Sequence, residues 1–228
     1  YNILQAAILA AERIFQLLDT QPAISAPAER VPAVRHAGVI EFENVWFAYK
    51  EDEWVLRDVS FRIEPGETIA VVGHTGAGKT TLTALLLRFY DIQKGAIRID
   101  GVDIRQMPFH QLRERFAVVL QDPFLFTGTI RDNIRLGSPI DDASLTRALD
   151  TVNLHDYISR LNDGLDHPVR ERGSGMSTGQ KQLISFARAL AHDPQFLILD
   201  EATSSVDTET ELRIREALDR LVEGRTSL

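Results

Sequence analysis

The sequence predicts an α/β fold in which short apolar strands form a mainly parallel sheet. Residues 68–72 (TIAVV) and 196–199 (FLIL) are short, fully apolar runs, as expected of strands buried on both faces of a parallel sheet. A segment with helical periodicity lies next to each of them. Residues 39–67 alternate in part and end near a Pro65-Gly66 turn, which indicates an additional antiparallel region.

Composition and charge narrow the class of protein. The chain has 228 residues, of which 44% are hydrophobic and 25% charged, the balance of an ordinary globular domain. The net charge of -8 argues against nucleic acid as a partner, because phosphate backbones select basic surfaces. Cysteine is absent, so neither a disulfide nor a thiolate metal site can form. No apolar run reaches the roughly 20 residues of a membrane-spanning helix.

Residues 1–19 predict an amphipathic helix, and residues 20–37, rich in Pro and Ala, predict a linker. The helix starts without an N-cap, so we expect the sequence to be part of a longer polypeptide. The residues alone leave open whether this helix packs on its own domain. Its apolar stripe consists of Leu4, Ile8, Ala11, Phe15 and Leu18.

The remaining pattern predicts the other elements in chain order. They are strands at 39–49 and 55–67, the strand 68–72, a helix at 79–90, a hairpin at 97–104 that turns at Asp100-Gly101, a strand at 116–121, mostly helices over 122–170, a helix after Met176, the strand 196–199 and a helix at 209–222.

Gly73–Thr80 (GHTGAGKT) matches the phosphate-loop pattern G-x-x-x-x-G-K-[ST], and it lies between a predicted strand and a predicted helix. Glycines let the backbone wrap around phosphate, and the helix N-terminus adds partial positive charge. Lys79 is expected to reach the β- and γ-phosphates, and the Thr80 hydroxyl to bind Mg²⁺. The predicted phosphate-binding residues are Gly73, Thr75, Gly76, Ala77, Gly78, Lys79, Thr80 and Thr81.

Asp200 and Glu201 follow the apolar strand 196–199. Such a pair alone is usually structural. Together with the phosphate loop, it predicts that Asp200 holds Mg²⁺ and that Glu201 acts as general base on the attacking water.

Ser177 and Gln180 form a Ser-x-x-Gln capping box, which predicts a helix that starts after Ser177. The small, glycine-containing helix end around Gly179 suits an anion, although capping alone would explain the Ser and the Gln.

With these motifs in order, the chain resembles the nucleotide-binding domain of ATP-binding cassette (ABC) transporters over about residues 38–228. GHTGAGKT resembles the Walker A motif, FLILDE the Walker B motif, and MSTGQ the family signature usually written LSGGQ. Three further positions match the family. Gln121 matches the Q-loop glutamine, Tyr49 the A-loop aromatic that stacks on adenine, and Asp207 ends the D-loop-like SSVD. Without the motif order, Tyr49 would be read as a core residue and Asp207 as a helix cap.

The resemblance implies a P-loop NTPase fold with a RecA-like core of mainly parallel sheet, an antiparallel β subdomain, and a helical subdomain at about 122–190 that carries the signature. The segments QDPFLFTGTIRDNI and VRERGSGMSTGQ resemble the exporter branch, in which the ATPase domain follows a membrane domain. Residues 7–19 (AILAAERIFQLLD) resemble the cytoplasmic end of its last membrane helix. Residues 1–37 are therefore predicted to be that helix end plus the linker.

The resemblance also implies the roles of the site residues. It implies that Lys79, Thr80, Gln121, Asp200 and Glu201 act on the ATP of their own domain, with Thr80, Gln121 and Asp200 around Mg²⁺. Ser177, Gly179 and Gln180 are implied to act on the γ-phosphate of a second nucleotide-binding domain, identical or different, and Asp207 is counted among the nucleotide-binding residues. The expected cofactors are ATP and Mg²⁺, the expected partners are that second domain and the chain's own transmembrane domain, and the expected location is the cytoplasmic face of the inner membrane.

Two departures from the family pattern leave alternatives open. Met176 and Thr178 replace the usual Leu and Gly of the signature, and none of the six histidines matches the family's switch histidine, whose position would follow Leu228. The signature changes are not expected to inactivate the motif, because Leu to Met conserves volume. Without the switch histidine and the membrane domain, we expect weak or no ATPase activity and a monomer for these 228 residues alone. A regulatory half of a heterodimeric exporter is the main alternative, although such halves commonly lose the glutamate that this chain keeps as Glu201. A soluble cassette ATPase of chromosome maintenance or translation is disfavoured because such proteins carry long coiled coils or a second cassette. A separate importer ATPase is disfavoured by the segment 7–19, which precedes the expected domain start near Val39.

Overall fold

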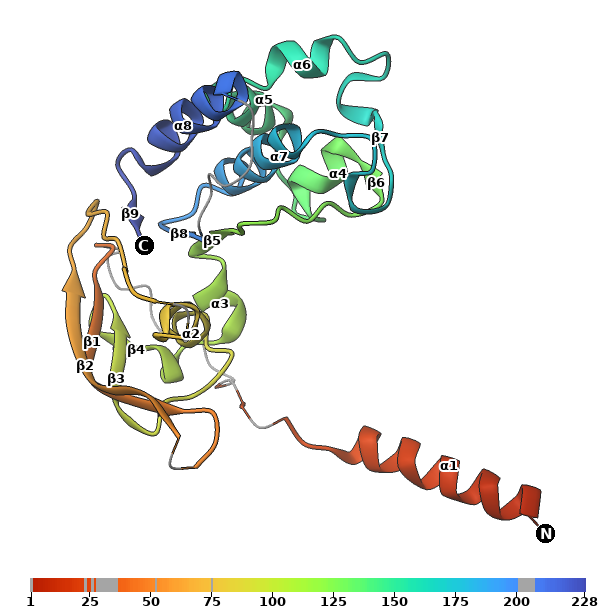
Figure 1. Cartoon of the computed structure of the whole chain (residues 1–228), viewed down its shortest axis with the longest axis vertical. Coiled ribbons are helices and arrows are strands. Elements are labelled where there is room, and N and C mark those ends of the chain that lie inside the picture. Colours follow the sequence, from red (N-terminus) through yellow and green to blue (C-terminus); the bar gives the residue numbers. More distant parts are fainter. Residues whose placement is uncertain are drawn as a thin grey trace.

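The computed structural model describes residues 2–22, 24–25, 27, 37–51, 53–74, 76–200 and 208–228. The main body is elongated (Figure 1): an antiparallel sheet lies at one end, a group of helices lies at the other, and a parallel sheet lies between them.

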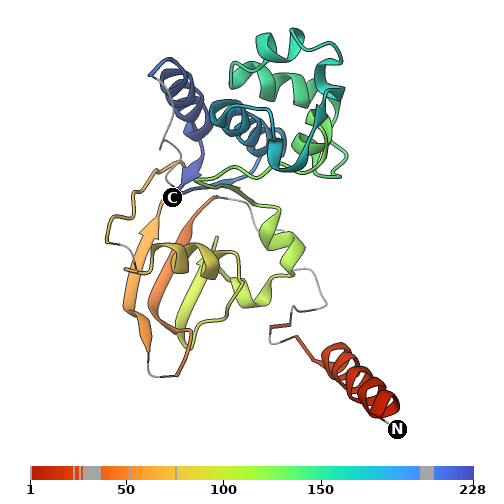
Figure 2. The same cartoon turned by 45° about the vertical axis from the view of Figure 1, so that its right-hand side comes forward.

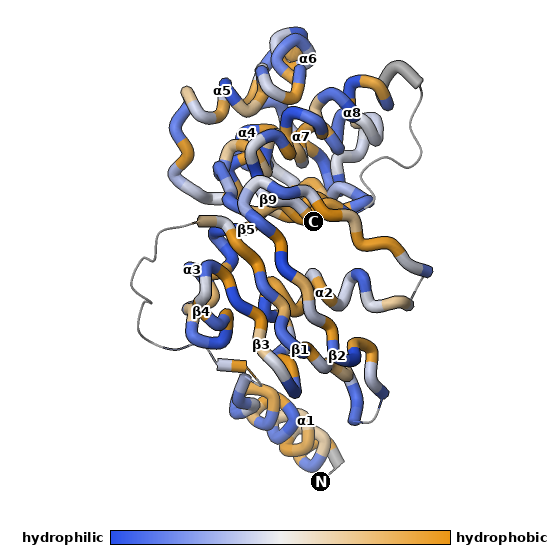
Figure 3. The backbone as a smooth tube through the Cα atoms, turned by 90° about the vertical axis from the view of Figure 1, so that its left-hand side faces the viewer, coloured by the Kyte–Doolittle hydropathy of each residue, from blue (hydrophilic) through white to orange (hydrophobic). Residues whose placement is uncertain are grey.

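The antiparallel sheet has the strand order β2-β1-β3-β4. Its strands are β1 (Ile40–Ala48), β2 (Trp54–Ile63), β3 (Lys94–Ile99) and β4 (Val102–Asp103). The residues of these strands alternate in part between hydrophobic and hydrophilic (Figure 3), because one face packs on a core. The predicted hairpin turn is confirmed: Asp100 and Gly101 both have positive φ, of 52° and 79°, as expected of an Asp-Gly type I′ turn.

The helices α2 (Lys79–Leu86) and α3 (Phe109–Arg113) and the 3₁₀ turn η1 (Ile104–Gln106) cover this sheet and close its core. The helix α2 ends four residues earlier than predicted. Arg88, just after it, has a φ of 51°, which a helix cannot contain. Its guanidinium is buried, and it donates hydrogen bonds to both carboxylate oxygens of Asp91 and to the carbonyl of Arg105.

The parallel sheet has the order β5-β8-β9 and joins three distant parts of the chain. These strands are β5 (Phe116–Val119), β8 (Phe196–Leu199) and β9 (Thr226–Ser227). The two predicted strands are confirmed, the first one over residues 116–119 only. They are parallel neighbours, with Val119 opposite Leu199.

The predicted strand at residues 68–72 is wrong. Only Thr68 forms a bridge, to Ser227, and the amide of Ile69 donates to the Ser227 carbonyl at 3.0 Å. Val72 is 90% exposed, although its apolar character predicted burial. Beyond Ile69, the backbone hydrogen bonds of the described residues pair no further part of this segment, so its apolar composition is not matched by strand pairing.

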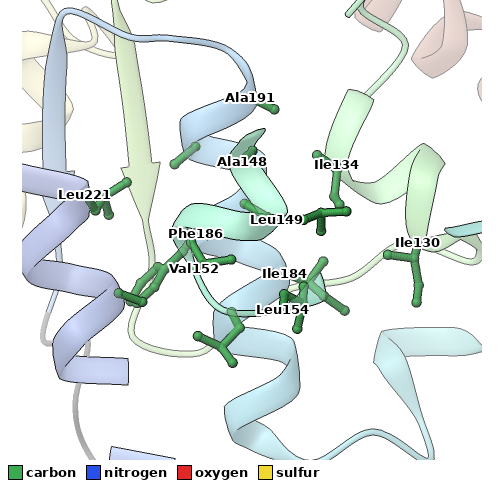
Figure 4. Close-up of a cluster of buried hydrophobic side chains, with 14 of the residues drawn as sticks. Ile130, Ile134, Ala148, Leu149, Val152, Leu154, Ile184, Phe186, Ala191 and Leu221 are labelled. Atoms are coloured by element: carbon green, nitrogen blue, oxygen red, sulfur yellow. The ribbon is translucent and has the colours of Figure 1, made fainter. Parts of the chain in front are cut away.

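Most residues of the segment 122–170 are helical or lie in loops, as predicted, and two further helices complete this region. The elements are β6 (Gly128–Thr129), α4 (Ile130–Arg135), α5 (Asp142–Thr151), α6 (His155–Ser159), η2 (Gly164–Asp166), β7 (Pro168–Val169), η3 (Glu171–Gly173), α7 (Thr178–Ala191) and α8 (Thr208–Val222). The helix α7 lies at the centre of a second core (Figure 4), in which Ile184, Phe186 and Leu221 have no exposed surface.

The helix α1 (Asn2–Asp19) confirms the amphipathic helix predicted from the sequence. It extends away from the rest of the described chain in both views (Figure 1, Figure 2). Its apolar residues Ile8, Phe15 and Leu18 are each more than half exposed. Within the described part of the chain, no helix combines the length and the apolar character needed to span a bilayer.

Candidate functional site

The glycine-rich loop ends at the N-terminus of α2. Gly78 is the N-cap of this helix, with a φ of 92°, and among the described residues no side chain caps the helix. Gly76 also has a positive φ, of 85°, a conformation that costs little only for glycine. The first backbone N–H groups of α2 are therefore left for an anion that approaches along the helix axis.

The side chain of Lys79 folds back across this loop. Its Nζ donates hydrogen bonds to the carbonyls of Gly73 at 2.6 Å and of His74 at 3.2 Å. These bonds hold the ammonium group at the loop, where it adds a full positive charge to the partial charge of the helix end.

Residues far apart in the sequence meet at one cavity. A cavity of about 380 Å³ is lined by Lys79, Thr80 and Asp200, together with apolar side chains of α2, β5 and β8. The Asp200 amide donates to the Val119 carbonyl at 2.9 Å, which fixes the residue at the carboxyl end of β8. Lys79, Thr80 and Asp200 thus border the same space between α2 and the parallel sheet.

Gln121 belongs to the same edge of the sheet. It follows β5 by two residues, and because β5 and β8 are parallel with Val119 opposite Leu199, Gln121 leaves the sheet at the same end as Asp200. Thr75, Glu201 and Asp207, which the sequence also assigned to the site, lie outside the described residues.

The side chain of Tyr49 lies at the end of β1 and is 51% exposed. Its hydroxyl is 3.1 Å from the Thr81 hydroxyl, and Thr81 follows directly after Lys79-Thr80. The predicted aromatic residue is therefore next to the phosphate loop. The rings of Tyr49 and Tyr90 are perpendicular at 5.0 Å. Tyr90 was not predicted as a site residue, since nothing in its spacing distinguishes it from the helix pattern before it.

The signature helix α7 starts as its capping box predicts. The Gln180 amide donates to the Ser177 hydroxyl at 3.2 Å, and the Ser177 amide donates to the Gln180 side chain at 2.9 Å. Ser177 is exposed and Gly179 is buried. No residue of 176–180 lines the cavity that Lys79 and Asp200 share, so the signature and the phosphate loop form separate parts of the surface.

A glycine-rich loop that opens a helix, and a carboxylate at the end of a parallel strand facing the same cavity, define a P-loop NTPase. The family model described as ABC transporter matches residues 56–204, more than half of the chain. The chain belongs to the ABC transporter family and forms its ATPase domain.

Known proteins support this assignment along the whole chain. An uncharacterised ABC transporter ATP-binding protein of Bacillus subtilis, YknV, is 47% identical over 229 residues, covering 100% of this chain and 38% of the relative. An ATP-dependent lipid A-core flippase of Saccharophagus degradans is 45% identical, covering 100% of this chain and 39% of the relative.

A solved structure shows the same fold. A bacterial Atm1-family ABC exporter with ATP bound matches with a TM-score of 0.86 and 36% identity, covering 98% of this chain and 39% of that chain. The chain thus spans 38% to 39% of the length of these relatives.

Proposed function

We propose that this chain is the ATP-binding and ATP-hydrolysing motor domain of an ABC exporter. The observation that carries the proposal is the shared cavity, which is lined both by Lys79 and Thr80 of the phosphate loop and by Asp200 at the end of β8. The similarity to a lipid A-core flippase and to an Atm1-family exporter supports the exporter branch.

In this proposal the chain's own residues bind ATP and prepare the attack on it. The loop 73–78, the α2 N-terminus and Lys79 hold the phosphates, and Tyr49 stacks on adenine. The carboxylate of Glu201 accepts a proton from water as the water oxygen bonds to the γ-phosphorus and the bond to the ADP oxygen breaks. ADP and inorganic phosphate are the products.

The donor set at the cavity suits Mg²⁺. Thr80 and Asp200 offer a hydroxyl and a carboxylate, Gln121 adds an amide oxygen at the same sheet edge, and Mg²⁺ prefers oxygen ligands. Among the described residues, no group of three His, Cys, Asp or Glu side chains forms a metal cage. The ion would therefore need phosphate oxygens as well, and it would neutralise charge on the phosphates when bound.

The signature serves the ATP of a second copy or of a homologous domain. Ser177 and Gly179 lie at the N-terminus of a 14-residue helix that is separate from the chain's own phosphate loop. A γ-phosphate presented by a partner would meet this helix end, with Gln180 beside it. Because ATP then contacts both halves, binding closes the dimer and hydrolysis releases it.

The helix α1 and the linker connect the domain to a membrane domain at the cytoplasmic face of the inner membrane. The exposed apolar side chains of α1 suit a helix that continues from such a domain. The exported substrate would be a drug, lipid or peptide, chosen by the membrane domain.

The test is the substitution Glu201→Gln in the full-length protein. The amide keeps the size of the side chain but cannot take a proton from water, so we expect ATP binding to persist and turnover to fall by at least about a hundredfold, as expected for loss of a general base. The ATP-bound dimer should accumulate in size-exclusion chromatography.

The matched control is Glu216→Gln, which makes the same chemical change on an exposed position of α8 and should leave turnover unchanged. Unchanged ATPase activity of the Glu201→Gln variant would refute the role given to Glu201. We also expect the double variant Lys79→Ala, Thr80→Ala to lose ATP binding, because both residues line the proposed ATP cavity.

A further inference from the structure

The ring of Tyr49 is held in place although half of its surface is exposed. Phe47, only 2% exposed, packs against it at 4.8 Å with an interplanar angle of 84°. Tyr90 packs against it at 5.0 Å and 88°. Such edge contacts between aromatic rings stabilise their relative orientation. An exposed tyrosine on a strand end would otherwise be free to change rotamer.

A hydrogen bond fixes the far end of the same ring. The Tyr49 hydroxyl lies 3.1 Å from the hydroxyl of Thr81, which is only 5% exposed. Thr81 is on the first turn of α2, directly after Lys79 and Thr80. The bond therefore ties the aromatic ring to the helix end that faces the phosphates.

We infer that Thr81 and Tyr90 are positioning residues that set the Tyr49 ring as a platform for the base of the nucleotide. This inference rests on the proposed function, in which Tyr49 stacks on adenine. It goes further by assigning the orientation of the platform to two side chains. Thr81 lies in the first turn of α2, and Tyr90 lies shortly after the helix ends. The same helix thereby sets both the phosphate end and the base end of the site.

Preorganisation is the physical reason for such an arrangement. A ring that is already oriented loses little rotamer entropy when a flat base stacks on it. Phe47 supplies the buried side of the platform, and Tyr90, which is 45% exposed, supplies the rim. Removal of the hydrogen bond to Thr81 or of the ring contact with Tyr90 should weaken the binding of a ligand that has a base. The affinity for a ligand without a base should not change.

The experiment compares ATP with inorganic tripolyphosphate, which has the phosphates but no base. Both are titrated by calorimetry into full-length protein, with EDTA present to prevent hydrolysis. We expect Tyr49→Phe, which removes the hydroxyl only, and Tyr90→Leu, which removes the edge contact, each to weaken ATP binding about threefold to tenfold. Tripolyphosphate affinity should stay within about twofold, the scatter expected of an uninvolved site.

Two conservative variants serve as controls. Tyr90→Phe keeps the ring, so it should bind ATP within about twofold of the wild type. Tyr157→Phe removes a tyrosine hydroxyl in the helical region, where the side chain packs against the other core, and should change neither affinity.

The inference is overturned if both Tyr49→Phe and Tyr90→Leu bind ATP as tightly as the wild type or more tightly. It is also overturned if these variants lose affinity for ATP and for tripolyphosphate to the same extent. Tyr49→Leu separates this inference from the proposed function. If Tyr49→Leu leaves ATP affinity unchanged, the adenine platform itself is wrong. If only Tyr49→Leu weakens ATP binding, the platform stands and the positioning roles of Thr81 and Tyr90 fail.

Discussion

The substitution Gly78→Ala tests the phosphate loop through both stability and binding. Gly78 has a φ of +92°, and a Cβ built there would lie 3.0 Å from Leu56 Cδ2 and 3.3 Å from Val55 Cγ1. The left-handed backbone costs a residue with a Cβ about 1–2 kcal/mol. The clash with β2 adds the cost of overpacking, about 1–3 kcal/mol. We therefore expect a total loss of about 2–5 kcal/mol.

Gly101→Ala is the matched control, because Gly101 has a φ of +79° and a Cβ there would meet nothing within 4 Å. It should lose only the backbone part, about 1–2 kcal/mol. Urea denaturation followed by tryptophan fluorescence measures both variants, since Trp46 and Trp54 pack against each other at 5.5 Å on the sheet that Gly78 touches.

Binding of ATP separates the two glycines further. Gly78→Ala should weaken ATP binding by more than about tenfold, because the shifted helix start moves the N–H groups that face the phosphates. Gly101→Ala should leave binding unchanged. The reasoning is refuted if the two variants lose the same stability, or if Gly78→Ala binds ATP as the wild type does.

Two further predictions concern the helical region. Phe186→Ala removes a ring with no exposed surface and should lower the free energy of unfolding by about 3–5 kcal/mol. Phe126→Ala, at a ring that is 53% exposed, should lower the free energy of unfolding much less. Equal urea midpoints for the two variants would contradict the central place of Phe186 in this core. Hydrogen bonds from the hydroxyl and amide of Thr129 hold the pKa of Asp132 below its usual value. Since that pKa is lower in the folded state, the stabilisation is complete above the unfolded pKa of about 3.9 and is lost as pH falls through the folded pKa. Asp132→Asn should therefore unfold at lower urea concentration at pH 7, and its difference from the wild type should shrink in acid. If the stability difference between Asp132→Asn and the wild type stays constant from pH 7 to pH 3, the stabilising role of the ionised Asp132 is wrong.

Local chemistry was read correctly from the sequence. The Ser-x-x-Gln pattern predicted the start of α7, and both of its hydrogen bonds are present. The Asp100-Gly101 pair predicted a hairpin turn, and both residues have the positive φ that this turn needs. These signals succeed because every atom involved lies within a few residues of the chain.

Signals that depend on distant partners were less reliable. The apolar run 68–72 has the composition of a buried strand, but composition does not report backbone pairing, and in the structure Thr68 alone of these residues forms a bridge, to Ser227. The helix pattern up to Tyr90 likewise did not indicate that Arg88 leaves the helical conformation, with its guanidinium buried against Asp91 and the Arg105 carbonyl.

The sequence by itself determined the family, the phosphate loop, the capped signature helix and the strands that precede Gln121 and Asp200. Only the tertiary structure decided which of these meet. It brings Lys79 and Thr80 to the same cavity as Asp200, leaves the signature outside that cavity, and joins the Tyr49 ring to Thr81. The reason is physical: periodicity and capping report on short-range backbone and burial preferences, whereas the neighbours of a side chain depend on how distant segments pack together.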